Sequence, residues 1–233
     1  MSVTRRLVLL ACLLAPAVAV AEEAPLPYVT PKQVDLTRLL PPPPAVGSPA
    51  ELTDRAAAVA AQKRASPERV ALAVHDTDET VYAIFGSVMG ERFEATKLPL
   101  TDRLFARLGA GEDDTVDPAK PFFGRVRPWL AMPDEIKPLV KSSKSGSWPS
   151  GHTTRATLEG IVLAAMMPEK KTEIWARVGE YAESRVVGGM HFPQDVEAGR
   201  LAGTAMATAA FLDPAFVADF EAAKAELRAA YGL

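Results

Sequence analysis

The sequence Ser184-Arg185-Val186-Val187-Gly188-Gly189-Met190-His191-Phe192-Pro193-Gln194-Asp195 joins two segments that both carry helical patterns. In the first segment, apolar residues recur at the spacing of one helix face, and Arg185 continues that face. A cation on a buried face needs an anionic partner, because an unpaired buried charge is strongly unfavourable. The glycine pair ends the first helix, and the proline suits the first turn of the next. The stretch therefore brings a buried cation, His191 and Asp195 to one helix junction.

Two interpretations of the spacing between His191 and Asp195 remain open at this point. Asp195 follows His191 by four residues, so its carboxylate can accept the Nδ1 proton of the imidazole and leave Nε2 free to react. Alternatively, the stretch is a plain helix–loop–helix in which Asp195 only favours the positive end of the second helix.

Composition favours a single helical domain with an exported N-terminus. The chain has 233 residues, of which 48% are hydrophobic and only 7% aromatic, and alanine and leucine predominate over runs of valine. Arg5 and Arg6 precede the apolar segment 7–20 and a small-residue cleavage site at 19–21, which predicts a signal peptide over residues 1–21 and a periplasmic protein. The general export route fits better than the twin-arginine route, and a lipid anchor on Cys12 fits poorly because the apolar segment before it is short.

The mature protein is predicted to be acidic and without disulfides. Removal of residues 1–21 takes away two arginines, no acidic residue and the single cysteine, so the net charge of −3 becomes −5. Such a chain is a poor general binder of nucleic acid or of anionic membranes. Clustered cations are therefore expected to serve a local anion site.

Residues 22–48 are expected to form an extended Pro-rich arm, and residues 49–233 a helical domain. Start and stop residues predict helices over 50–63, from Pro67, over 77–89, over 101–108, from His152 to Pro168, over 193–211 and from Pro214 to Tyr231. Gly199, Gly203 and Ala207 recur every four residues, which allows close approach of a neighbouring helix, in a soluble core rather than in a membrane dimer.

A second group of cations lies in the segment from Lys120 to Pro128. Lys120 and Arg127 are seven residues apart, so in a helix they share one face at a separation of about 10 Å and reach one anion. Proline after Arg127 disfavours continuation of that helix. Arg125 fits an exposed basic patch, which is also the alternative interpretation of the whole segment.

A third stretch, Pro149-Ser150-Gly151-His152, leads into a helix. Ser150 is the expected cap, and the backbone N–H groups at the start of the helix form an anion site. With Lys120, Arg127 and Arg185, these donors describe a pocket for a tetrahedral oxyanion such as phosphate. His152 and His191 add the two imidazoles that metal-free phosphoryl transfer requires, one to attack phosphorus and one to protonate the leaving oxygen. The imidazole that attacks must be neutral and the imidazole that donates must be protonated. The sequence therefore predicts a bell-shaped pH profile of activity with an acidic-to-neutral optimum.

The order and spacing of these residues resemble the three-part signature of the type-2 phosphatidic acid phosphatase (PAP2) superfamily. Within it, the chain is most similar to the bacterial class A non-specific acid phosphatases, with which it shares Leu39-Leu40 before four prolines and the segment from Gly146 to Thr153. The resemblance extends from about residue 39 to the C-terminus. Trp148 departs from it, because the class A pattern has tyrosine there, so substrate preference is open.

The resemblance implies an all-α fold, a compact helical bundle of the PAP2/haloperoxidase type. It implies His191 as nucleophile, Asp195 as the residue that orients it, and His152 as general acid and then base. It implies no metal or other cofactor, and it implies small phosphate monoesters as substrates, with inorganic phosphate or vanadate as pocket ligands. The implied phosphate-binding residues are Lys120, Arg127, Ser150, Gly151 and Arg185.

Three other functions use the same residues. They are a vanadate-dependent haloperoxidase, a lipid phosphate or pyrophosphate phosphatase, and a phosphate-binding module without catalysis. The short chain and the class A features disfavour the haloperoxidase. No apolar span follows residue 21, so stable membrane insertion is not expected, and a binding module has no need of both histidines and Asp195. The sequence leaves the oligomeric state open, a homo-oligomer included.

Overall fold

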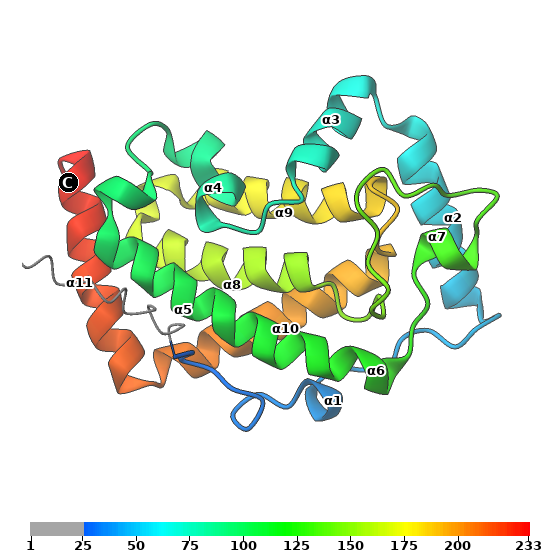
Figure 1. The fold of residues 1–233 in the computed structure, drawn as a ribbon, viewed down its shortest axis with the longest axis horizontal. Coiled ribbons are helices and arrows are strands. Elements are labelled where there is room, and N and C mark those ends of the chain that lie inside the picture. Colours follow the sequence, from blue (N-terminus) through cyan, green and yellow to red (C-terminus); the bar gives the residue numbers. More distant parts are fainter. Residues whose placement is uncertain (1–25) are drawn as a thin grey trace, which may run out of the picture.

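The computed structural model describes residues 26–233, and this part of the chain is helical without a β-strand. The predicted signal peptide lies outside the described residues. Figure 1 shows three long helices running side by side, α5 (Pro99–Val116), α8 (Gly151–Met166) and α9 (Lys171–Val187), with α10 (Pro193–Phe211) behind them. Helix α11 (Pro214–Tyr231) closes one end, and α2 (Pro49–Arg64) and α3 (Pro67–His75) lie at the other. Helix α4 (Val81–Met89) packs on α8 and α9.

Short elements connect the long helices. They are α1 (Leu36–Leu39), α6 (Lys120–Phe123), α7 (Pro128–Ala131) and three 3₁₀ turns at Ala95–Lys97, Asp117–Ala119 and Pro168–Lys170. Several helix starts follow local rules that are visible in the sequence. Ser48, Ser66 and Asp213 each accept a backbone N–H bond at a helix start and precede a proline in the first turn.

Helix α8 is buried between its neighbours because α10 approaches it closely. A Cβ atom on Gly203 would lie 2.5 Å from the carbonyl oxygen of Thr154, and one on Gly199 would lie 2.7 Å from that of Ser150. Any larger residue at either position would push the two backbones apart. The small-residue spacing therefore serves packing between two helices of one core, as the sequence predicts.

The N-terminal arm lies along one edge of the bundle (Figure 1). Tyr28, Leu36 and Leu40 are buried, and Tyr28 packs edge-on against the Phe216 ring. The Tyr28 hydroxyl donates a hydrogen bond of 2.7 Å to Asp219 in α11. Apolar burial and this hydrogen bond hold the arm to the last helix.

The structure decides one open case and corrects two helix extents predicted from sequence. The helix expected over 101–108 extends over Pro99–Val116. Lys120 and Arg127 do not share one helix, because α6 ends at Phe123, Gly124 adopts a left-handed conformation with φ of 61°, and Arg127 is extended. The helix expected over 77–89 begins only at Val81, with Thr80 as its cap, so residues 77–80 form a loop. This loop carries a residue of the site described below.

Within residues 26–233, no single helix has both the length and the apolar composition needed to cross a membrane. Helices α10 and α11 pass that composition test only as a pair, and they are bent by 94° relative to each other.

Candidate active site

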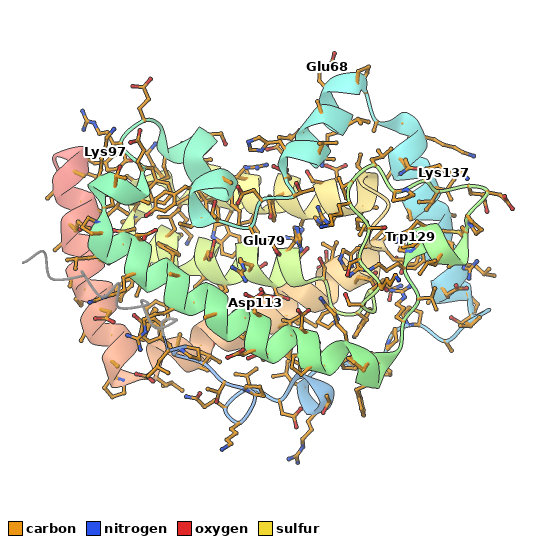
Figure 2. The ribbon with its side chains drawn as sticks, viewed as in Figure 1. Glu68, Glu79, Lys97, Asp113, Trp129 and Lys137 are labelled. Atoms are coloured by element: carbon orange, nitrogen blue, oxygen red, sulfur yellow. The ribbon has the colours of Figure 1, made fainter. Side chains whose placement is uncertain are left out.

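A polar pocket of about 240 Å³ opens among the ends of α5, α6, α8 and α9. Figure 2 labels two of its lining residues, Asp113 on α5 and Glu79 on the segment that joins α3 to α4. Six of the eight site residues predicted from sequence line the pocket: Lys120, Arg127, Gly151, His152, Arg185 and His191. The other two, Ser150 and Asp195, are fully buried behind it.

The turn after α9 positions His191. Gly189 has a φ of 76°, and a Cβ atom there would lie 2.8 Å from the carbonyl oxygen of Lys137, so glycine is required. The backbone N–H groups of Met190 and His191 then both donate to the carbonyl of Arg185. These bonds direct the His191 side chain into the pocket, where it is 2% exposed.

The two nitrogens of His191 have different partners. Nδ1 lies 2.8 Å from the carbonyl oxygen of Ser147, which can only accept, so Nδ1 carries the proton. Nε2 lies 3.1 Å from Nη1 of Arg127, which can only donate. Burial lowers the pKa of His191 well below its usual value, and the neighbouring Arg127 and Arg185 lower it further. The imidazole is therefore neutral, with the lone pair of Nε2 in the pocket.

Asp195 does not accept the Nδ1 proton, contrary to the sequence interpretation. Its Oδ2 lies 3.6 Å from Nδ1 of His191 and accepts the Phe192 backbone N–H at 2.7 Å. Its Oδ1 accepts from Arg125 at 2.6 Å. Asp195 thus fixes the first turn of α10 and the backbone beside His191, while the Ser147 carbonyl sets the tautomer.

Arg125 is buried, and its placement in an exposed basic patch was wrong. It is 9% exposed, bonds Asp195 with one nitrogen and Asp54 of α2 with the other, each at 2.6 Å, and lies 4.3 Å from the centre of the Phe192 ring. Asp54 also accepts the backbone N–H of Gln194. This ion triad ties α2 to the start of α10, and no local sequence signal marked either Arg125 or Asp54.

Three predicted cations converge on the pocket with mostly neutral partners. Arg127 donates to the Ser145 and Met190 carbonyls, and Arg185 to the carbonyl of Asp76. Burial lowers the pKa of Arg127 to about 10, with Arg185 adding to the effect, and burial also lowers the pKa of Arg185. Among these three cations, Lys120 alone pairs with a carboxylate of the described residues 26–233, Asp117 at 2.7 Å. Uncompensated guanidinium charge makes the pocket attractive to an anion.

The N-terminus of α8 completes the anion site. Ser150 caps the helix by accepting the N–H of Thr153, so it acts through the backbone, and Gly151 borders the pocket. A Cβ atom on Gly151 would lie 3.6 Å from Nζ of Lys120, which places the helix start beside that cation. Backbone N–H groups of a first helical turn favour negative charge.

His152 follows in the first turn of α8, and its two nitrogens also differ. Nδ1 lies 2.7 Å from Oε1 of Glu79, whereas Nε2 is buried and has no hydrogen-bond partner within residues 26–233. Its ring stacks on Tyr181, with centroids 6.0 Å apart. Burial lowers the pKa of His152, and Glu79 opposes that effect. Sequence reasoning missed Glu79, because it lies far from His152 along the chain.

The remaining wall of the pocket is acidic. Glu112 is fully buried and Asp113 is largely exposed, and both pair with Arg155. Burial raises the pKa of Glu112 to about 8, and the charge of Arg155 acts against this rise. In the described part of the chain, no group of three or more His, Cys, Asp or Glu residues is arranged to hold a metal ion.

Comparison with known proteins identifies the family. Residues 109–217 match the PAP2 superfamily, and this segment contains all eight predicted site residues. The non-specific acid phosphatase of Salmonella typhimurium is 32% identical over 188 residues, which are 76% of this chain and 74% of that protein. The non-specific acid phosphatase of Providencia stuartii is 31% identical over 204 residues, 83% and 81% of the two chains. The chain belongs to the PAP2 superfamily.

A solved PAP2 structure shares the fold. It is the transmembrane PAP2-type phosphatidylglycerolphosphate phosphatase from Bacillus subtilis, with a TM-score of 0.51 and 22% identity over 80% of this chain and 92% of that one. At this identity the match supports the architecture alone. The predictions of the PAP2 superfamily, an all-α fold and an acid phosphatase are confirmed.

Proposed function

We propose that this PAP2 acid phosphatase hydrolyses a broad range of phosphate monoesters without a metal, through a phosphohistidine on His191. The observation that carries the proposal is the pair of imidazoles in one cationic pocket, each with a fixed Nδ1 partner. Nε2 of His191 keeps its lone pair toward the pocket beside Arg127, and Nε2 of His152 has no hydrogen-bond partner within residues 26–233. Phosphate binding alone requires the cations and the helix start, but it does not require two oriented histidines.

The first step transfers the phosphoryl group to the enzyme. The guanidinium groups of Arg127 and Arg185, the ammonium of Lys120 and the N–H groups at Gly151 hold the phosphate oxygens and offset their charge. Nε2 of His191 attacks phosphorus, and the bond from phosphorus to the ester oxygen breaks. That oxygen takes a proton from Nε2 of protonated His152 and leaves as an alcohol.

The second step releases phosphate. His152, now neutral at Nε2, removes a proton from a water molecule that attacks the phosphohistidine. The bond from phosphorus to Nε2 breaks, and inorganic phosphate and neutral His191 are restored. Throughout the cycle, the Ser147 carbonyl keeps the remaining proton of His191 on Nδ1.

The test is p-nitrophenyl phosphate hydrolysis by the mature protein in excess EDTA. Wild type is expected to turn over, and His191→Ala to lose activity by several orders of magnitude. The chain has only three histidines, and His75→Ala is a matched control, since that side chain is 63% exposed and lies outside the pocket. Rapid quenching of His152→Ala should trap an acid-labile, alkali-stable phosphohistidine. Loss of turnover in EDTA, or full activity of His191→Ala, would refute the proposal.

The proposed site of action is the periplasm, supported by the export pattern of residues 1–21. We expect the mature chain to begin at Glu22 and to appear in the fraction released by osmotic shock. N-terminal sequencing of that fraction is the measurement. An uncleaved chain recovered with the cytosol would contradict this location.

A further inference from the structure

Glu79 is the acidic partner of the second histidine of the pocket. Its Oε1 lies 2.7 Å from Nδ1 of His152, and its side chain lines the pocket. It stands outside the segment that matches the PAP2 superfamily, in the loop between α3 and α4. Glu79 therefore reaches the pocket from a part of the sequence separate from the segment that carries the eight predicted site residues.

Helix α9 fixes the loop that carries Glu79. Asp76 accepts hydrogen bonds from Arg177 and Ser184, and the Asp78 carbonyl accepts one from Tyr181 at 2.9 Å. The Asp78 side chain in turn accepts the N–H of Thr80, the cap of α4. With both sides of Glu79 anchored, its carboxylate is held against His152 before any substrate arrives.

The surroundings of His152 would otherwise disfavour its charged form. Burial and the nearby Arg185 both lower its pKa, and the hydrogen bond and charge of Glu79 act against them. The titratable and charged groups that face this pair come from α5, α6, α8, α9 and the loops beside them: Glu112, Asp113, Asp117, Lys120, Arg127, Lys141, Arg155, Tyr181, Arg185 and His191. Glu79 itself is the carboxylate next to His152, with Oε1 2.7 Å from Nδ1.

We propose that Glu79 is a positioning residue that holds the Nδ1 proton of His152 and thereby presents Nε2 as the proton donor to the leaving oxygen. The inference rests on the proposed function, and it adds the group that makes a buried imidazole an effective acid. In the first step the proton on Nε2 passes to the ester oxygen, and the Nδ1 proton stays in the hydrogen bond to Glu79. In the second step Nε2 takes a proton from water, and the carboxylate again stabilises the imidazolium.

The activity test compares leaving groups. An alkyl phosphate needs protonation of its leaving oxygen, whereas p-nitrophenolate leaves readily without it. In Glu79→Gln, kcat/KM for an alkyl phosphate should fall about 10- to 100-fold, within the range that general acid catalysis contributes, and kcat/KM for p-nitrophenyl phosphate only a few-fold. This parameter reports formation of the phosphohistidine, whereas kcat also includes its hydrolysis, which is common to both substrates. The alkaline limb of kcat/KM should move to lower pH. The substrate's own ionisation is common to both enzymes and cancels in the comparison.

Asp113→Asn is the matched control, since it removes one carboxylate charge from the same pocket wall without touching a histidine. It should leave both the leaving-group dependence and the alkaline limb near wild type. Equal losses on both substrates in Glu79→Gln, with an unmoved alkaline limb, would overturn the inference. Full activity of His191→Ala in the same assay would instead refute the proposed function, so the two failures are distinguishable.

A spectroscopic test needs no activity measurement. Nitrogen-15 correlation spectra of the three histidine side chains, assigned with His152→Ala, report which nitrogen carries the proton. Wild-type His152, when neutral, should be protonated on Nδ1, and its pKa should fall further in Glu79→Gln. A neutral His152 protonated on Nε2, or an unchanged pKa in the folded variant, would overturn the inference.

Discussion

Replacement of Gly203 by alanine tests the close packing of α10 on α8. The added Cβ atom would lie 2.5 Å from the Thr154 carbonyl oxygen, 2.8 Å from Cβ of Thr157 and 3.0 Å from the Leu158 nitrogen. Two of these atoms are backbone, so relief requires a shift of a whole helix rather than of a side-chain end. Overpacking costs about 1–3 kcal/mol, and a 2.5 Å contact with a backbone atom corresponds to the upper part of that range, about 2–3 kcal/mol. The higher helix propensity of alanine returns about 1 kcal/mol.

The net expectation for Gly203→Ala is a loss of about 1–2 kcal/mol, or a fall of about 2–8 °C in Tm for a domain of this size. Gly179→Ala in α9 is the matched control, because its Cβ atom would meet no atom within 4 Å. Alanine should therefore stabilise the protein there by about 0.5–1 kcal/mol through helix propensity and reduced chain entropy.

Thermal unfolding of both variants, followed by circular dichroism at 222 nm, is the assay. Tm should fall in Gly203→Ala and rise in Gly179→Ala. Opposite signs separate the effect of close contact between α10 and α8 from a general effect of replacing glycine. A Gly203→Ala protein as stable as wild type would refute the reasoning, since it would mean that α8 and α10 do not approach as closely as the structure shows.

Three further predictions follow from the buried charges and hydrogen bonds. Arg125→Met should lower the free energy of unfolding by about 3–5 kcal/mol, because it leaves the buried carboxylates of Asp54 and Asp195 without their cation. Urea unfolding should show a smaller loss of stability at low pH, where carboxyl groups are protonated. The pH profile of kcat/KM should be bell-shaped, with its alkaline limb below pH 6.5. Burial lowers the pKa of His152, so the protonated imidazole that acts as the acid is lost as the pH rises. Activity that increases steadily to pH 10 would contradict this prediction. Tyr28→Phe should cost about 1 kcal/mol in urea unfolding by removing the bond to Asp219, and an unchanged midpoint would mean that this bond does not hold the arm.

Much of the fold was accessible from sequence because helix boundaries are encoded locally. The bounds Pro193–Phe211 and Pro214–Tyr231 follow from prolines, caps and the intervening break, and the structure reproduces them. The cations and histidines of the pocket could likewise be named from their spacing in three motifs. Each of these signals lies within a few residues of the feature it specifies.

The partners of the two histidines could not be predicted, because they depend on loops far away in sequence. Ser147 meets His191 through a backbone carbonyl, which leaves no trace in residue type, and the two are 44 positions apart. Arg125 and Asp195 are 70 positions apart, and a lone arginine beside two other cations resembles a surface patch until the fold buries it. Glu79 lay in a segment expected to be helical, where a glutamate is unremarkable.

The junction of α8 and α10 affects both the packing of the core and the positions of the two histidines in the pocket. The Ser150 N–H donates to the Asp195 carbonyl at 3.0 Å, which joins the cap of one helix to the first turn of the other. His152 follows that cap and His191 precedes that turn, so the separation of the two imidazoles depends on how closely the helices approach. Gly199 permits the approach, since a Cβ atom there would lie 2.7 Å from the Ser150 carbonyl oxygen. The small residues that pack α10 on α8 therefore also influence the distance between the two histidines that line the pocket.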